Sequence, residues 1–351
     1  MSDNKGYIGF ACAYTPLPVI YAAGYTPYRV LPMGDSQDQA GHILHDNLCP
    51  HIKRILDRAM SNDLPDLAGM VFMNSCDAMR RLADAWHHIR PGENSILLDL
   101  PATADELSIS FFAGEISKLT VALSKWSGRD ISKAEIEYGI LLYNQIADFM
   151  NELTERIYAG KTNTSPSVLQ KLLNRSVTGS PIIFIEEARK FLSENIQKKI
   201  NNDGVPVFLF GHVLPDPETF MFFESCGVKI TGDDLCTGSR FFSPVETDAS
   251  KDLIESLAES LLHRPPCART IDSAIPGNIG KIMISKATKS GAHGAIAHVV
   301  KFCDPYFSRL PSIREEFQKA GMPLLVLEGD CTLRSIGQQQ TRIEAFIEMI
   351  G

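Results

Sequence analysis

The sequence predicts an α/β protein with two doubly wound, Rossmann-like parallel-sheet domains and a helical insertion between them. Short apolar runs alternate with amphipathic stretches over roughly the first hundred residues, and the same alternation returns after residue 206. Strand patterns are absent in between. A chain of 351 residues is long enough for two domains of ordinary size. We therefore expect domains at 1–104 and 201–351, with an insertion at 105–200 packed on the first domain.

The first domain is expected to alternate strands with helices. Its apolar runs are too short for helices, and the stretches between them have helical periodicity, one of which ends at Gly24. Strands separated by helices pair in parallel. The expected strands are 7–13, 28–33, 68–74 and 95–100, and the expected helices are 16–23, 36–61 and 77–89.

The pattern of residues 105–198 predicts helices throughout. Apolar residues recur every three or four positions, as in Ile136, Ile140, Tyr143 and Ile146, which is typical of a helix with one buried face. We interpret the methionine and phenylalanine side chains of this region as core filling. The region therefore predicts a helical insertion or bridge.

The second domain is expected to have the same architecture as the first, without a convincing sequence repeat between them. Its apolar runs and periodic stretches alternate in the same way. The expected strands are 206–212, 228–231, 295–302 and 323–328, and the expected helices are 217–225, 250–263, 276–290, 311–320 and 339–350.

The composition restricts the class of function. A net charge of -8 argues against a nucleic-acid surface, because phosphate binding needs clustered Lys and Arg. The N-terminal segment lacks the pattern of a secretory signal, and no segment approaches about 18 consecutive apolar residues, so we expect a cytoplasmic protein without a membrane span. In that reducing compartment the eight cysteines indicate buried thiols, catalysis or metal binding.

The placement of the cysteines favours a metal site. In open α/β sheets, ligands bind outside the carboxyl ends of the strands, where helix N-termini also favour thiolates. No CxxC pair occurs, so the ligands would come from distant loops. Cys49 lies beside Pro50, which interrupts or restarts a helix, and Cys226 and Cys267 are interpreted as ordinary thiols. Five cysteines lie at or just past the end of an expected strand: Cys12, Cys76, Cys236, Cys303 and Cys331.

Two rival motifs are weaker. His42 and His45 at helical spacing, with Cys49 one turn further, could offer three ligands to zinc, but a fourth ligand is missing. The triplet 160–162 (Gly-Lys-Thr) resembles the end of a phosphate loop, but Glu155 stands where the first glycine belongs, so we interpret it as a helix end and turn. No G-x-G-x-x-G follows a strand. Any ATP chemistry is therefore expected from another protein.

Three side chains are candidate proton donors near the expected site. Asp234, together with Asp233, precedes Cys236 at a strand end, where the pair could also cap the loop or bind a cation. His212 and His298 lie on expected strands near the same crevice. Each histidine could instead be a core residue with satisfied hydrogen bonds.

Several long motifs resemble one known family. NSCDAMRRLADAW around Cys76, HVVKFCDPY around Cys303 and the C-terminal LEGDCTLRSIGQQQTRIEAFIEMI are similar to the 2-hydroxyacyl-CoA dehydratase and benzoyl-CoA reductase family, in its cluster-bearing component. CAYTPLPVIYAAGYTPYRV and GDDLCTGSR fit the same family, so the resemblance extends over nearly the whole chain.

The resemblance implies an iron-sulfur cluster gripped between two α/β domains. It also implies an ATP-hydrolysing iron-sulfur activator dimer that donates electrons at very low potential. By matching motifs, one four-iron cubane would be held by Cys49, Cys76 and Cys303. Three further strand-end cysteines resemble the double-cubane branch, in which a sulfide joins two cubanes into an eight-iron cluster; we assign the second cubane by placement to Cys12, Cys236 and Cys331.

The expected function is an ATP-dependent reductase of a small molecule that acts as a homodimer. Within the family, the alternative is a 2-hydroxyacyl-CoA dehydratase subunit with one four-iron cluster. Outside catalysis, the chain could be an electron relay or a cluster carrier. Iron counting and ATP consumption with the activator distinguish these functions.

Overall fold

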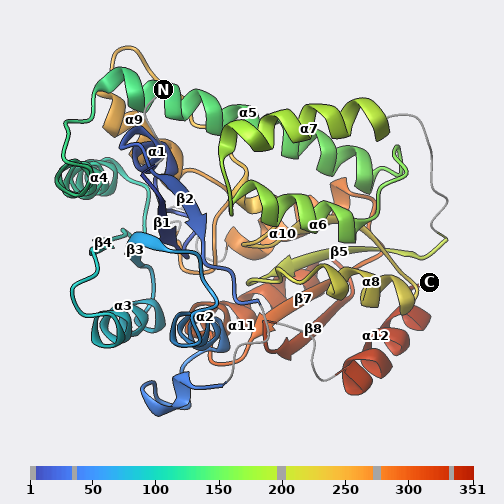
Figure 1. Cartoon of the computed structure of the whole chain (residues 1–351). Helices are drawn as coiled ribbons and strands as arrows, with labels where there is room; N and C mark the ends of the chain where they lie inside the picture. The colour runs from blue at the N-terminus through green and yellow to red at the C-terminus, as the bar shows by residue number, and fades with distance from the viewer. Residues whose placement is uncertain (1–4, 34–37, 196–202, 272–277, 332–335) are drawn as a thin grey trace.

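The computed structural model contains two four-stranded parallel sheets within the residues that it describes, 5–33, 38–195, 203–271, 278–331 and 336–351 (Figure 1). The first sheet has the order β2-β1-β3-β4 and the second β6-β5-β7-β8, so the two halves share one topology. The two-domain α/β architecture is confirmed. The strands are β1 (Tyr7–Phe10), β2 (Thr26–Arg29), β3 (Leu67–Asn74), β4 (Ser95–Asp99), β5 (Val205–Gly211), β6 (Val228–Asp234), β7 (Gly294–Val300) and β8 (Leu324–Gly329).

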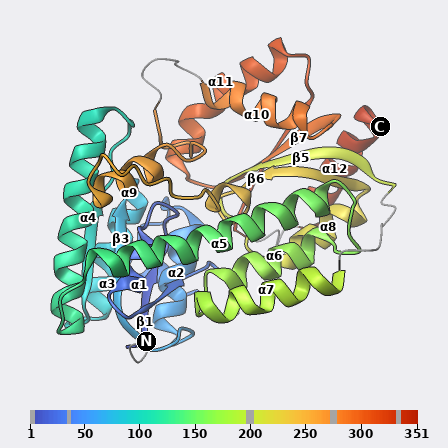
Figure 2. The same ribbon diagram turned by 90° about the horizontal axis from the view of Figure 1, so that it is seen from above.

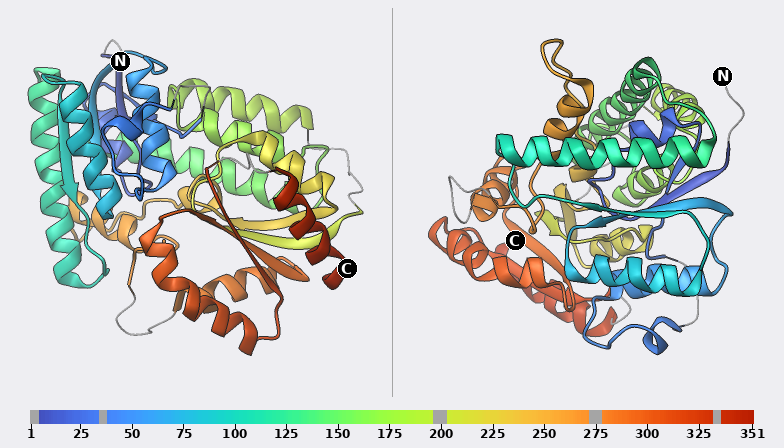
Figure 3. Two further views of the ribbon diagram at one scale, coloured as in Figure 1. Left: turned by 90° about the horizontal axis from the view of Figure 1, so that it is seen from below. Right: turned by 90° about the vertical axis from the view of Figure 1, so that its left-hand side faces the viewer.

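Both faces of the central strands are buried, as their continuous apolar runs require, whereas the edge strand β4 is largely exposed. Along β3, Met70 and Phe72 face one core, whereas Val71 and Met73 face another. Phe210 of β5 lies in the same core as Phe72, so the two halves share a central layer of apolar side chains. Figure 3 shows the two halves side by side from two further directions.

The helices of the first half are α1 (Leu17–Ala22), α2 (Pro50–Met60) and α3 (Asp77–Ile89), with a short 3-10 turn at Ala40–His42. The expected helix over 36–61 is therefore wrong in its first part, and residues 36 and 37 lie outside the described residues. Pro50 has no N–H to donate, which suits the first turn of a helix, and Cys49 before it is extended (φ -64°, ψ 143°). Proline restarts the helix here.

Two of the expected strands are shorter or shifted. β1 ends at Phe10 instead of residue 13, because the chain turns at Cys12, whose carbonyl accepts from the Thr15 N–H. β2 covers 26–29 instead of 28–33, because the chain turns after Val30, with the Met33 N–H bonded to the Leu31 carbonyl. Buried apolar residues that lie outside the sheet therefore extended the apolar runs from which the strands were predicted.

Four helices form the middle of the chain: α4 (Glu106–Ser127), α5 (Lys133–Tyr158), α6 (Pro166–Ser176) and α7 (Pro181–Asn195). Asp105 caps α4, and Ser132 and Glu135 form a capping box at α5. α5 packs against α1 and reaches β6, and α6 packs against α8 (Pro217–Ser225) (Figure 2). The helical segment thus contacts both halves. Gly160 follows α5 with a φ of 65°, so the Gly-Lys-Thr triplet is a helix end and turn, as expected.

α4 departs from the expectation that no segment is long and apolar enough for a membrane span. By length and composition alone this 22-residue helix could cross a membrane, and 33% of its most apolar stretch is buried. In the fold, α4 packs against β4 and α9 (Leu253–Leu262). It is therefore a helix of the α/β core in this structure.

The second half is completed by α10 (Asn278–Lys289), α11 (Asp304–Lys319) and α12 (Ile336–Ile350), with a 3-10 turn at Ser239–Phe241. The helix expected at 311–320 begins seven residues earlier. Pro305 lies in the first turn, where proline is tolerated, and Pro311 lies inside the helix. Residues 276 and 277 of the helix expected at 276–290 lie outside the described residues.

Candidate functional site: a cavity lined by cysteines

One cavity collects side chains from both halves of the chain. It lies beyond the carboxyl ends of the strands, at the edge where ligands bind in open α/β sheets. Three of its cysteines come from the first half and three from the second, and all six belong to separate segments. They are Cys12, Cys49, Cys76, Cys236, Cys267 and Cys303.

Three of these cysteines occupy the same structural position. Cys49, Cys76 and Cys303 are the N-cap residues of α2, α3 and α11. Burial raises the pKa of all three thiols, that of Cys76 to about 11, while backbone N–H groups of the first helical turns act in the opposite direction. The charges of Cys49 and Cys76 also raise the pKa of Cys303. These three thiols, expected to hold the first cubane, are therefore neighbours.

The other three cysteines form a second group. Burial raises the pKa of Cys12 to about 12, with further contributions from the charges of Cys236 and Cys267. Cys267 likewise has a pKa raised by burial and by Cys236. Cys267, interpreted from the sequence as an ordinary thiol, thus lines the cavity near Cys12 and Cys236, and its charge also raises the pKa of Cys76 and Cys303. No strand precedes it, so a rule based on strand ends could not find it.

Cys331 does not line this cavity. Its side chain is fully buried just past β8, and its pKa is raised by burial, by Asp330 and by the charge of Cys49. It lies in the same apolar core as Cys49, and Cys12 and Cys236 pack against that core. Cys226, at the end of α8, is buried in a separate apolar core, which agrees with its interpretation as an ordinary thiol.

Guanidinium groups surround the cysteines. Arg29 Nη2 donates to Cys236 Sγ at 3.1 Å, and its Nη1 donates to the Cys236 carbonyl at 2.9 Å. Arg269 donates to three carbonyl oxygens, including that of Ser75 at 2.8 Å. Arg29 and Arg269 form no ion pair with a carboxylate in the described part of the chain. Buried positive charges need a counter-charge, which an anionic cluster held by thiolates would supply. The donor set and its charge therefore fit an iron-sulfur cluster.

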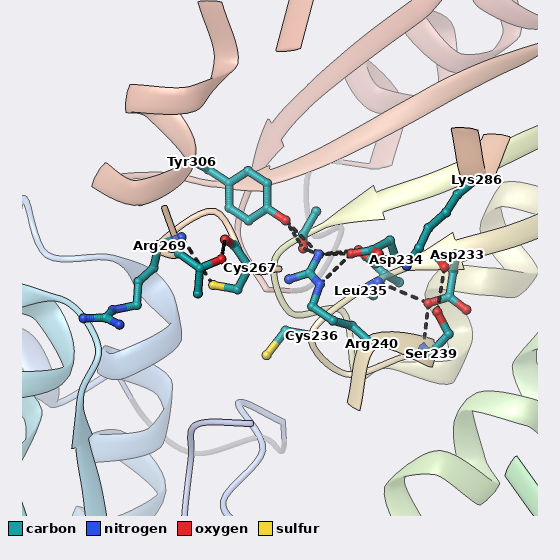
Figure 4. A network of polar contacts seen from close by, with 12 residues as sticks. Asp233, Asp234, Leu235, Cys236, Ser239, Arg240, Cys267, Arg269, Lys286 and Tyr306 are labelled. Atoms are coloured by element: carbon teal, nitrogen blue, oxygen red, sulfur yellow. Dashed lines mark hydrogen bonds and ion pairs between the residues drawn. The ribbon is translucent and has the colours of Figure 1, made fainter. Parts of the chain in front are cut away.

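A fourth arginine belongs to a closed ionic network (Figure 4). Arg240 and Lys286 both pair with Asp234, and Arg240 also donates to the Tyr306 hydroxyl at 2.9 Å. Asp234, an expected proton donor, is fully buried between these two cations and does not line the cavity. Its role in this structure is to hold Arg240 at the cavity wall.

Asp233 caps the loop that carries Cys236. Its carboxylate accepts from the backbone N–H groups of Leu235 and Ser239 at 3.1 and 2.9 Å, and from the Tyr158 hydroxyl at 2.8 Å. Of the interpretations that the sequence allows, this geometry corresponds to loop capping.

Of the three histidines near the site, His51 and His298 are buried and His212 is partly buried. His212, at the end of β5, lines the cavity, and its Nδ1 has no hydrogen-bond partner in the described structure. His51, which the sequence did not single out, lines the cavity 5.2 Å from His212, measured between ring centroids. His298 is fully buried and does not line it. Burial lowers the pKa of His51 to about 3 and of His298 to about 4, so the neutral form of each is favoured at pH 7.

The rival zinc site is not formed. His42 and His45 are exposed, whereas Cys49 is buried. Within the described residues, no group of three or more His, Cys, Asp or Glu side chains is arranged around a single ion.

Comparison with known proteins identifies the family. The family model "2-hydroxyglutaryl-CoA dehydratase, D-component" matches residues 12–350. The chain belongs to this family. It is 24% identical to lactoyl-CoA dehydratase subunit beta of Anaerotignum propionicum, over 99% of the chain and 92% of that protein. It is 22% identical to a subunit of benzoyl-CoA reductase from Thauera aromatica, over 92% of the chain and 85% of that protein.

A further relative is (R)-2-hydroxyglutaryl-CoA dehydratase subunit beta of Acidaminococcus fermentans, which is 22% identical over 99% of the chain and 93% of that protein. Relatives therefore include both dehydratase and reductase subunits, and enzyme activity is supported. A solved structure of a GTP-binding protein from Sulfolobus solfataricus matches with 8% identity over 99% of this chain and all of that one, but its TM-score of 0.24 is too low to support any inference.

Proposed function

We propose that this chain is the cluster-bearing component of an ATP-dependent iron-sulfur reductase that acts on a small molecule. The observation that carries the proposal is the single cavity with six cysteines from six segments. Each group of three would offer thiolates to one cubane, and a bridging sulfide would join the two cubanes into an eight-iron cluster. The ligands would be Cys49, Cys76 and Cys303 for one cubane and Cys12, Cys236 and Cys267 for the other.

A bound cluster would supply electrons at low potential, and the residues of the chain would control its surroundings. Arg29 would stabilise the Cys236 sulfur and hold its loop. Apolar residues such as Met79 and Ile52 would limit water at the cavity wall. His212 is the candidate proton donor that lines the cavity, with His51 beside it.

The proposal includes partners. The relatives are subunits of larger enzymes, which supports a separate partner component. We propose an ATP-hydrolysing iron-sulfur activator as the electron donor and a homodimer as the assembly. The activator would supply the ATP chemistry for which this chain carries no G-x-G-x-x-G motif after a strand.

Iron and sulfide analysis of protein purified without oxygen tests the cluster and its ligands. We expect about eight iron atoms per wild-type chain and about four in Cys267→Ala, because one triad is broken. Cys331→Ala is expected to keep the wild-type iron content, and Cys226→Ala is the matched control for loss of a buried thiol outside the cavity. If Cys331→Ala halves the iron while Cys267→Ala keeps it, the second triad contains Cys331, as the sequence alone suggested.

A dehydratase subunit with one four-iron cluster is the second candidate, because relatives include lactoyl-CoA and 2-hydroxyglutaryl-CoA dehydratase subunits. It predicts about four iron atoms per chain and no effect of Cys267→Ala on the iron content. An electron relay would show no substrate-dependent ATP consumption with the activator, and a cluster carrier would lose its iron readily to an apo acceptor.

A further inference from the structure

A second cavity adjoins the cysteine-lined cavity. The two share Ala13 and Arg264, and Ala13 follows directly after Cys12. The wall of the second cavity is mostly apolar and comes from α1, α5, the end of α9 and the segment after Cys236. Its apolar residues include Leu17, Ile146, Ala147, Phe241 and Leu261.

Two polar groups of residues that line the cysteine-lined cavity have no partner among the described residues, and one of these residues, Arg264, lines both cavities. The Tyr14 hydroxyl and the Arg264 Nε are both buried, in side chains that are 3% and 9% exposed. The Arg264 guanidinium lies over the Tyr14 ring, 5.6 Å from the ring centroid, so the two side chains are in contact. Arg264 Nη1 donates to the Ala13 carbonyl, which fixes the guanidinium at the boundary.

The other arginines near the cysteine-lined cavity form hydrogen bonds or ion pairs with groups of the protein. Arg29 bonds Cys236, Arg269 bonds three carbonyl oxygens, and Arg240 is paired with Asp234. Burial lowers the pKa of Arg264, yet a guanidinium stays protonated at pH 7. A buried cation beside an unpartnered phenol, with no carboxylate in contact within the described structure, is suited to an anionic ligand.

We propose that Arg264 and Tyr14 bind the carboxylate of a short-chain organic acid, with its apolar chain in the second cavity. The carboxylate would accept from the guanidinium and from the Tyr14 hydroxyl, on the side of the cavity that carries Cys12. The apolar wall would accommodate a chain of a few carbons. A short-chain organic acid would be the substrate of the proposed reductase, and this assignment rests on that proposed function. Binding of the acid can be measured independently of it.

Calorimetric titration of the anaerobically purified protein with butyrate tests the site. We expect Arg264→Met to weaken butyrate binding at least about tenfold, and Tyr14→Phe to weaken it about three- to tenfold, because each removes a buried hydrogen-bond donor. His263→Ala, an exposed neighbour of Arg264 in the sequence, is the control and is expected to bind butyrate like wild type. Butyramide and 1-butanol, which carry no charge, are expected to bind at least about tenfold more weakly than butyrate.

The apolar part of the proposal is tested with acids of different chain length. Affinity is expected to rise from acetate through propionate to butyrate, and Ala147→Leu, which fills the second cavity, is expected to weaken butyrate more than acetate. Equal binding of butyrate by wild type and Arg264→Met, or equal binding of butyrate and butyramide, overturns the proposal. The same samples are assayed for iron. Full iron without butyrate binding removes only this inference, whereas butyrate binding without iron removes only the proposed reductase.

Discussion

At the scale of single residues, the site combines thiols and fixed cations in a buried space. Six cysteines line one cavity, and Arg29 donates directly to the sulfur of one of them. A thiol buried without a metal holds its proton, as the raised pKa of Cys12 indicates. The nearby arginines that have no carboxylate partner favour instead the anionic, thiolate form of the cysteines. Metal binding satisfies both requirements, because it removes the thiol protons and places negative charge beside the guanidinium groups.

The buried histidines predict a stability that depends on pH. The pKa of His298 is lowered by burial from 6.5 to about 4, so protonation favours the unfolded chain. The contribution of His298 to the free energy of unfolding is complete above pH 6.5 and is lost as the pH falls from 6.5 towards 4. We expect up to about 3 kcal/mol from this residue over that window. Urea unfolding of wild type and His298→Gln between pH 7 and 4.5 measures it.

His298→Gln is expected to lose less stability on acidification than wild type, whatever its stability at pH 7. His293→Gln changes an exposed histidine just before β7, so it is the control and should keep the wild-type slope. Parallel slopes for wild type and His298→Gln would mean that His298 does not titrate on unfolding. Iron content is followed in each sample so that cluster loss is separated from unfolding.

At the scale of elements, Gly211 shows why the end of β5 needs a glycine. Its φ is 142°, and a Cβ there would overlap the carbonyl of His298 on β7. The Gly211 carbonyl also accepts from Arg240 and Tyr306 at the cavity wall. Gly211→Ala is therefore expected to destabilise the protein by about 3 kcal/mol or more.

Exposed Gly114 in α4 is the matched control, since a Cβ there would meet no atom within 4 Å. Gly114→Ala is expected to be neutral or to stabilise by up to about 1 kcal/mol, because alanine favours the helix. Urea midpoints followed by circular dichroism compare the two variants. A midpoint for Gly211→Ala equal to that of Gly114→Ala would contradict the backbone argument.

The elements that the sequence predicted well are those with a single dominant signal. The apolar runs at β3 and β5 indicated buried strands, and the long periodicity of α5 identified a helix. Proline positions were harder, because Pro50 starts α2 whereas Pro311 lies inside α11. The same local rules pointed to the strand-end cysteines of the cavity, but also to Cys331, which does not line it. Cys267 was missed because its position depends on how the loop after α9 returns to the cavity, which is a tertiary property.

At the scale of the whole molecule, the cavity joins the two halves. Each half contributes three of its six cysteines, and the shared core beside them contains Phe72 from one half and Phe210 from the other. Helix α5 contacts both halves, and α9 returns from the second half to pack on α4 of the helical middle segment. The six cysteines of the cavity can therefore meet only after both halves have folded, and a bound cluster would stabilise their association.

Iron removal is accordingly expected to destabilise the whole molecule. Ligands held in the folded state contribute their binding free energy to folding, and a loss of about 3 kcal/mol corresponds to a Tm decrease of about 4 °C in a chain of this size. Anaerobic calorimetry before and after chelation of the iron measures this decrease. The double variant His42→Ala and His45→Ala is the control: both side chains are exposed, so its iron content and Tm should equal those of wild type. An unchanged Tm after complete iron loss would show that the two halves associate without any contribution from the cluster, and the cysteines would then serve chemistry alone.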